Sequence, residues 1–130
     1  MAERLASHNI FKSLSEKSLG TLSDVSETRH YKKGEQLITE GQFNDRLFLL
    51  VKGTVRVESE DAGLIGALKP DAIVGEISTS GMSQPVATVT ADEDVEAITL
   101  PIEVVSEIAF EEEGFSNALR ALGMQRAAEV

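Results

Sequence analysis

Hydrophobic and polar positions follow two different periodicities along this chain, and these divide it into three regions. Over residues 1–26, apolar positions recur at helical spacing behind Ser15, which is a suitable N-cap. Over residues 27–100 the pattern changes to short apolar runs separated by turn-forming residues, and over 101–130 helical spacing returns. The pattern therefore predicts N-terminal helices, then a β-rich region, then two C-terminal helices.

The central region predicts a particular β architecture. Many short strands at regular spacing, separated by Gly, Pro, Asn and Asp, are typical of a β-roll or jelly-roll barrel. We expect one domain over residues 1–130, mainly β, in which the roll carries flanking helices. The predicted strands are His30–Tyr31, Gln36–Thr39, Arg46–Lys52, Thr54–Glu58, Leu64–Leu68, Val86–Ala91 and Val95–Leu100.

Two further helices are predicted after the roll. Pro101 suits the first position of a helix because its φ is already close to the helical value. Val105 and Ile108 fall on one face of that helix, and Gly114 predicts its end. A last helix is expected from about Phe115.

Composition narrows the chemistry that this domain can perform. The chain has 130 residues, of which 42% are hydrophobic, so it can bury a core of its own. It has no cysteine and two histidines, which leaves no zinc-finger ligands, disulfide framework or Cys/His nucleophile. No motif surrounds any serine, and we interpret His8 and His30 as ordinary surface or turn histidines. We therefore expect a non-enzymatic domain without a metal or cofactor.

Charge narrows the class of partner. The net charge is −10, and residues 58–130 carry 3 basic and 15 acidic side chains. Nucleic acids and anionic membranes both require a basic face, so neither is expected as a partner. The sequence shows no signal peptide and no apolar run of membrane-spanning length, and a cytoplasmic domain is the expectation.

Residues 75–89 interrupt the alternation of the strands. Gly75 and Glu76 are followed by Ser and Thr residues, a composition that suits a tight turn leading into one short helical turn. The first N–H groups of such a turn converge and can hold an anion. The Glu76 carboxylate is a suitable acceptor for sugar hydroxyls beside that anion.

The surrounding motifs carry a family resemblance over roughly residues 9–126. The segments 32–41, 47–53 and 68–76 read KKGEQLITEG, LFLLVKG and LKPDAIVGE, in that order. Together they resemble the cyclic nucleotide-binding domain family, which includes catabolite-activator-type regulators, regulatory subunits of protein kinase A and cyclic-nucleotide-gated channels. The resemblance implies a regulatory ligand-binding module, with cyclic AMP or cyclic GMP as the ligand.

The same resemblance assigns residues 75–89 to the phosphate-binding cassette. It places Glu76 on the ribose 2′-hydroxyl and the backbone N–H groups near Ile77 and Ser78 on the cyclic phosphate. It also requires an arginine, at a position that falls on Pro85 or on Val86 depending on the alignment. No Lys or Arg occurs from 70 to 119, so that arginine is absent. The cassette residues that the resemblance implies are Gly75, Glu76, Ile77, Ser78, Thr79, Pro85, Val86 and Ala87.

Two sources of compensation for the missing charge can be read from the sequence. Neutral donors could come from Ser78, Thr79, Ser80 and Gln84, and cations from Lys52, Arg56, Arg120 and Arg126. Two functions remain open. In the first, the domain is a sensor with weakened or altered cyclic nucleotide binding. In the second, it keeps the fold without the ligand and acts in protein interaction or homodimerisation.

Overall fold

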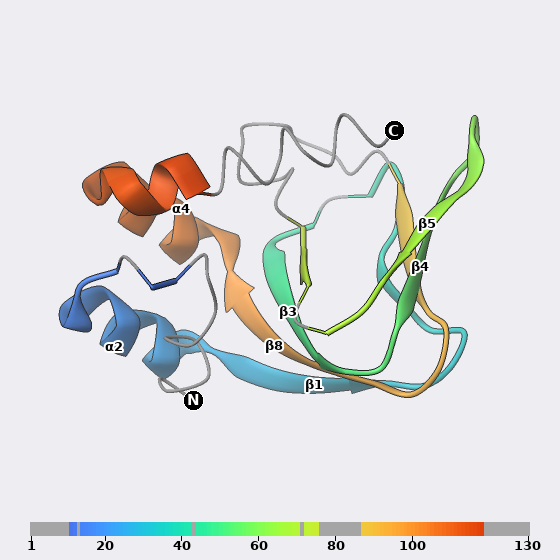
Figure 1. The fold of residues 1–130 in the computed structure, drawn as a ribbon, viewed down its shortest axis with the longest axis horizontal. Coiled ribbons are helices and arrows are strands. Elements are labelled where there is room, and N and C mark those ends of the chain that lie inside the picture. Colours follow the sequence, from blue (N-terminus) through green and yellow to red (C-terminus); the bar gives the residue numbers. More distant parts are fainter. Residues whose placement is uncertain (1–10, 13, 43, 71, 76–86, 119–130) are drawn as a thin grey trace.

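The central strands pair into two antiparallel four-stranded sheets that face each other as a roll (Figure 1). This computed structural model describes residues 11, 12, 14–42, 44–70, 72–75 and 87–118. Sheet A has the strand order β1–β8–β3–β6, and sheet B has the order β2–β7–β4–β5. The strands are β1 (Glu27–Tyr31), β2 (Gln36–Ile38), β3 (Arg46–Lys52), β4 (Val55–Ser59), β5 (Gly63–Leu68), β6 (Ile73–Val74), β7 (Thr88–Ala91) and β8 (Val95–Pro101).

Strand β3 lies inside sheet A and buries both of its faces. Leu47 and Leu49 pack on the helix side of the sheet, whereas Phe48 and Leu50 pack inside the roll. Successive side chains of a strand point to opposite faces, so a strand that is covered on both sides has to be apolar throughout. This is why residues 46–52 read as an almost continuous apolar run.

The domain therefore has two hydrophobic cores that share sheet A. The outer core lies between sheet A and the helices, and its buried members are Phe11, Leu14, Leu22, Leu47, Leu49, Ile73, Ile98, Leu100, Val105, Ile108 and Phe115. The inner core fills the roll with Leu37, Ile38, Phe48, Leu50, Val55, Val74, Val89, Ala91, Val95 and Ala97. Each large side chain buried in this way contributes about 1.5–3 kcal/mol relative to an exposed one.

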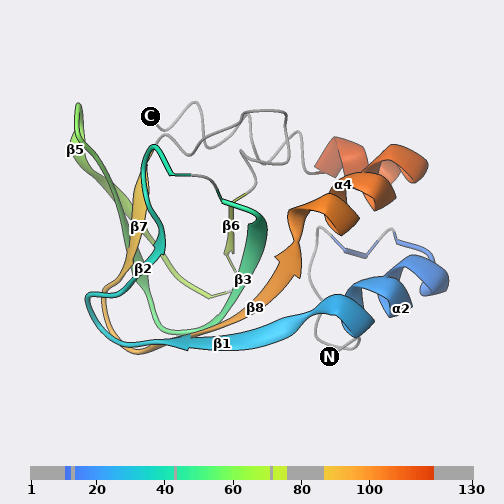
Figure 2. The same cartoon turned by 180° about the vertical axis from the view of Figure 1, so that it is seen from behind.

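Two helices, α2 (Glu16–Val25) and α4 (Ile102–Glu111), lie side by side outside sheet A (Figure 2). Ser15 is the N-cap of α2, as predicted, and its Oγ accepts a hydrogen bond from the Ser18 N–H at 3.2 Å. Among the described helices, none combines the length and the apolar character that crossing a membrane requires.

The predicted strand over 46–52 is confirmed, and the other predicted strands are found with shifted ends. Strand β1 begins at Glu27 rather than His30, because its polar side chains give no apolar pattern although its backbone pairs with β8. Strand β6 was not predicted, since the pair Ile73–Val74 is too short to show a period.

The C-terminal helices differ from the prediction at both ends of α4. Pro101 is the last residue of β8 and the N-cap of α4. The helix therefore begins at Ile102, one residue later than predicted. Gly114 does not end the helix: α4 ends before its C-cap Glu112, and residues 113–118 are helical again. The buried side chain of Phe115 anchors that second helical segment. The predictions for residues 1–10 and 119–130 lie outside the described residues.

Candidate functional site

The N-terminal end of the predicted cassette is held tightly against strand β3. Gly75 has a φ of +97°, and a Cβ at this position would lie 2.7 Å from the carbonyl oxygen of Arg46. The side chain of Asn44 braces the same carbonyl, since its Nδ2 donates to it at 2.8 Å and its Oδ1 accepts from the Arg46 N–H at 3.2 Å. Only glycine meets both requirements without strain, so the backbone where the cassette begins is well defined.

The C-terminal end of the predicted cassette runs into sheet B. Ala87 is half-buried, and the chain enters β7 at Thr88. The Oγ1 of Thr88 accepts a hydrogen bond from the Glu40 N–H at 3.0 Å, and Val89 is buried in the inner core. The cassette therefore connects β6 of sheet A to β7 of sheet B.

The structure describes only the two ends of the predicted ligand site. Gly75 and Ala87 lie where the chain leaves β6 and approaches β7. Outside the described residues are Glu76, Ile77, Ser78, Thr79, Pro85 and Val86, together with the neutral donors Ser80 and Gln84. The arginine-free composition of this segment is a property of the sequence and holds independently of the geometry.

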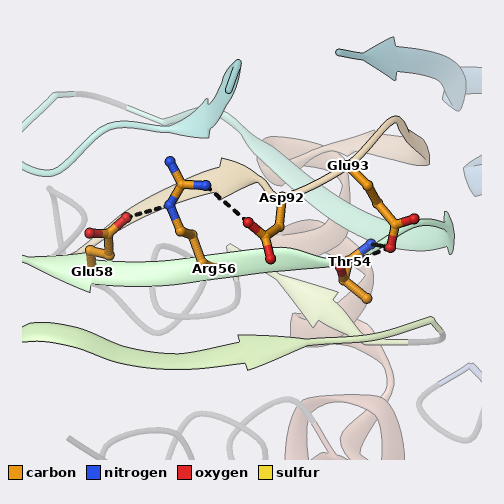
Figure 3. A network of polar contacts seen from close by, with 5 residues as sticks. All are labelled: Thr54, Arg56, Glu58, Asp92 and Glu93. Atoms are coloured by element: carbon orange, nitrogen blue, oxygen red, sulfur yellow. Dashed lines mark hydrogen bonds and ion pairs between the residues drawn. The ribbon is translucent and has the colours of Figure 1, made fainter. Parts of the chain in front are cut away.

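Arg56, one of the cations considered above, lies on the outside of the roll. Its neighbours Val55 and Val57 pack on the inner core, so the alternation of β4 directs Arg56 outward. Figure 3 shows its guanidinium between Glu58 and Asp92, with Nε–Oε1 and Nη1–Oδ1 distances of 2.7 and 3.1 Å. Hydrogen bonds to these carboxylates raise the pKa of Arg56. Arg56 is therefore already neutralised on the outer face of sheet B.

The network around Arg56 continues along the same face. Thr54 donates from its N–H and its Oγ1 to the Glu93 carboxylate at 3.2 and 2.9 Å (Figure 3). Lys52 is exposed at the C-terminal end of β3, away from the end that contacts Gly75. Arg120 and Arg126 lie outside the described residues.

Arg46, which the sequence analysis did not single out, is a half-buried cation whose backbone lies against Gly75, where the predicted cassette begins. Its side chain is 21% exposed, and its Nη2 lies 3.1 Å from Oε2 of Glu27. Its Nη1 is buried and has no hydrogen-bond partner among the described residues. A buried unpaired donor is rare in proteins. The signal in the sequence was a charge two positions before Phe48, and so on the same face of the strand, at the start of an apolar run from Leu47 to Val51.

Glu27 is shared between two arginines. Arg29 Nη2 also contacts Oε2 of Glu27, at 3.2 Å. Hydrogen bonds to Tyr31 and Glu27 raise the pKa of Arg29. Two guanidiniums therefore meet one carboxylate, and the cluster carries a net positive charge in a domain that is strongly acidic as a whole.

A hollow of about 420 Å³ opens at the end of the roll away from Gly75, where β1 and β3 end and β8 begins. Its lining carries both basic and acidic side chains. The lining residues are His30, Tyr31, Lys32, Glu35, Lys52, Asp94, Val95 and Glu96. His30 is largely exposed and its Nε2 lies 2.9 Å from Oε1 of Glu96. In the part of the chain that the structure describes, His, Asp and Glu residues form no group that could hold a metal ion.

Comparison with known sequences gives one family and several relatives. The sequence profile described as "Cyclic nucleotide-binding domain" matches residues 28–112. A cAMP-dependent protein kinase regulatory subunit from Eremothecium gossypii is 32% identical over 96 residues, which make up 74% of this chain and 21% of that protein. The match thus spans about one fifth of the length of the cAMP-dependent protein kinase regulatory subunits to which this chain is similar.

Comparison with solved structures shows the same fold at lower identity. The sensor domain of the transcriptional regulator DNR from Pseudomonas aeruginosa superposes with a TM-score of 0.86 at 19% identity, covering 97% of this chain and 92% of that one. The regulatory subunit of a cAMP-independent protein kinase A from Trypanosoma brucei superposes with a TM-score of 0.83 at 18% identity. This match covers 94% of this chain and 44% of that one. The predicted β-roll with flanking helices is confirmed.

Proposed function

The chain belongs to the cyclic nucleotide-binding domain family, and we propose that it is a sensor module of that family whose affinity for cyclic nucleotides is weakened or altered. The family is regulatory and ligand-binding, and the relatives reported above are named as regulatory subunits and a sensor domain. The ligand is a cyclic nucleotide or a related small anion, held by the segment between Gly75 and Ala87.

The observation that carries this proposal is the absence of any basic residue from 70 to 119. A bidentate arginine–phosphate contact is a strong, charge-assisted interaction. Removing one partner of such a buried pair costs about 2–5 kcal/mol, which corresponds to roughly 30- to 5,000-fold in affinity. A neutral hydrogen bond from Ser or Thr returns only about 0.5–1.5 kcal/mol. A ligand that depends on the cassette alone is therefore bound weakly.

A structural neighbour supports the idea that this fold can serve a kinase that does not depend on cyclic AMP. The Trypanosoma brucei regulatory subunit is described as belonging to a cAMP-independent kinase. A triple variant of that subunit, in which one substitution replaces threonine with arginine, is described as bound to cAMP. For the present chain, we propose by analogy that an arginine introduced into the cassette raises affinity.

The test is calorimetric titration with cyclic AMP and cyclic GMP, each up to millimolar concentration at low salt. We expect saturable but weak binding by the natural chain, which Glu76→Ala abolishes. Pro85→Arg and Val86→Arg, made separately because the alignment allows both positions, are expected to tighten binding in at least one case. Binding that is already tight, or that Glu76→Ala leaves unchanged, would contradict the proposal.

A second function is favoured by the acidic charge of residues 58–130, which opposes an anionic ligand. In that case the domain keeps the fold, binds no nucleotide and acts through a protein partner or a second copy of itself. The natural chain would then give no heat of binding with either nucleotide, while Pro85→Arg or Val86→Arg would restore binding. Light scattering would test for a homodimer. We place either function in the cytoplasm, away from nucleic acids and membranes.

A further inference from the structure

We propose that strand β5 (Gly63–Leu68) is a pairing surface for a second copy of this chain, in an antiparallel two-fold arrangement. β5 is an edge of sheet B, because it pairs only with β4 among the described strands. The β4–β5 hairpin projects at the periphery of the roll in both Figure 1 and Figure 2. The inference goes beyond the sensor proposal, since β5 is no part of the segment between Gly75 and Ala87.

β5 lacks the charges and prolines that protect a sheet edge. An edge strand presents backbone N–H and C=O groups that have no partner strand, and a long apolar edge is a template for another chain. The sequence of β5 is GLIGAL, which contains neither a charged residue nor a proline. Leu64 is 67% exposed, and Ala67 is exposed as well. The strand thus combines an open backbone edge with apolar side chains in solvent.

The exposed leucine of β5 lies on the outer face of sheet B. Val57, which packs on the inner core, is opposite Gly66, whereas the next residue, Glu58, is opposite Leu64. This change of register is a bulge in β5. Glu58 contacts the outward-pointing Arg56 (Figure 3), so Leu64 has charged neighbours within its own sheet. Nothing in the inner core therefore requires a leucine at this position.

The other edges of the two sheets are protected in ways that β5 is not. β1 carries Glu27, Arg29 and His30 among its five residues. β2 has three residues and β6 has two. Charged edges and very short edges are poor templates for a further strand. Of the four edges that the described strands form, β5 is therefore the one suited to pairing.

The charges at the two ends of β5 favour a second copy as the partner. Lys69 directly follows the strand, and Glu60 and Asp61 lie in the turn that precedes it. All three are exposed and form no ion pair within the described part of the chain. Antiparallel pairing of β5 with itself, Leu64 opposite Ala67 of the second copy, brings Lys69 of each copy to the acidic turn of the other. The two-fold axis repeats this attraction.

The interface is small, and we expect the dimer to be weak. A single paired edge lies well below the size of a permanent interface, and the net charge of −10 on each copy adds repulsion. The bulge bends β5 and limits the regular stretch available for pairing. The expected state is an equilibrium between monomer and dimer at physiological salt, where the long-range repulsion is screened.

The test is sedimentation equilibrium of the whole chain from micromolar to millimolar concentration. The natural chain is expected to shift from monomer toward dimer. Leu64→Lys should weaken dimerisation by about ten-fold or more, because pairing would desolvate the lysine. The new lysine faces Glu58 across the sheet, so the variant should stay folded, as circular dichroism will establish.

Phe110→Lys is the matched control. Phe110 is the other large hydrophobic side chain that is exposed among the described residues, it lies on α4, and its replacement changes the net charge by the same amount. This variant should dimerise like the natural chain. Equal weakening in Phe110→Lys and Leu64→Lys, or an unchanged dimer in Leu64→Lys, would overturn the assignment to β5.

A charge exchange tests the antiparallel arrangement. Lys69→Glu should weaken the dimer several-fold, because the new carboxylate meets the acidic turn of the other copy. Adding Asp61→Lys to that variant restores an attraction at each end and should return the affinity toward the natural value. A double variant that dimerises no better than Lys69→Glu would overturn the arrangement.

Hydrogen exchange identifies what covers β5. The amides of β5 that point away from β4 should gain protection as protein concentration rises. Protection of these amides already in the dilute chain would mean that another segment of the same chain covers the edge, and it would overturn the proposal, as would a monomer at every concentration. A monomer that binds cyclic nucleotide would retain the sensor proposal alone, and a β5 dimer that binds none would retain this inference alone.

Discussion

At position 75 the backbone makes two demands that only a glycine side chain meets. Its φ is +97°, and the Cβ position lies 2.7 Å from the Arg46 carbonyl oxygen. Left-handed backbone costs a residue with a Cβ about 1–2 kcal/mol, and steric contact adds to this. Gly75→Ala should therefore destabilise the domain by more than the strain alone, as measured by chemical denaturation.

Gly34 provides the control for this prediction. Its φ is +92°, similar to that of Gly75, yet no described atom lies within 4 Å of its Cβ position. Gly34→Ala should therefore show the strain without the steric contact. Equal losses of stability in Gly34→Ala and Gly75→Ala would mean that the contact between Gly75 and β3 contributes nothing.

At the scale of elements, Glu112 connects the two helices outside sheet A. It is the C-cap of α4, and its carboxylate accepts hydrogen bonds from the N–H and Oγ of Ser15, at 2.9 and 3.1 Å, and from the Oγ of Ser18. The negative charge thus lies at the N-terminus of α2, where the helix dipole favours it. The hydrogen bonds, that of Ser18 first, lower the pKa of Glu112.

This lowered pKa predicts a pH-dependent contribution to stability. The folded-state pKa of Glu112 lies below its ordinary value of 4.5, so its contribution is fully present above that pH and is lost as pH falls through the folded-state pKa. Glu112→Gln should lower the denaturation midpoint near neutral pH, and its difference from the natural chain should shrink on acidification. Glu111→Gln, at the exposed neighbouring position, is the control. A difference that is constant with pH would contradict the role of the charge.

At the scale of the whole molecule, the two cores share strands β3 and β8 and should unfold together. Phe11 and Phe115 meet in the outer core with ring centroids 5.7 Å apart, and Tyr31 packs edge-on against Phe48 in the inner core at 6.3 Å. A sheet that supplies one face to each core cannot lose one without exposing its own apolar side chains to water.

The chain offers a direct measurement of this coupling. Tyr31 is its single tyrosine and it has no tryptophan, so tyrosine fluorescence reports on the roll. Far-ultraviolet circular dichroism reports mainly on the helices. The two denaturation curves should coincide. A fluorescence transition at lower denaturant concentration would show that the roll opens while the helix layer remains folded.

Much of the fold was encoded locally, and could therefore be predicted. Strand β3 shows its apolar character residue by residue, and Ser15 carries the side chain that an N-cap requires. Features that lack a local period were missed or misplaced. The polar β1 is a strand because its backbone pairs with β8, and helical structure continues through Gly114 because Phe115 is buried in the outer core.

The sequence by itself determined that the chain can form the family's roll and that residues 70–119 contain no basic side chain, since composition does not depend on folding. It did not show which cations are already paired with carboxylates. Arg46 and Glu27 meet only because β8 lies between their strands, and Arg56 is excluded only because β4 turns it outward. Such contacts depend on strand order and register, which are set by the packing of the whole domain and not by neighbouring residues.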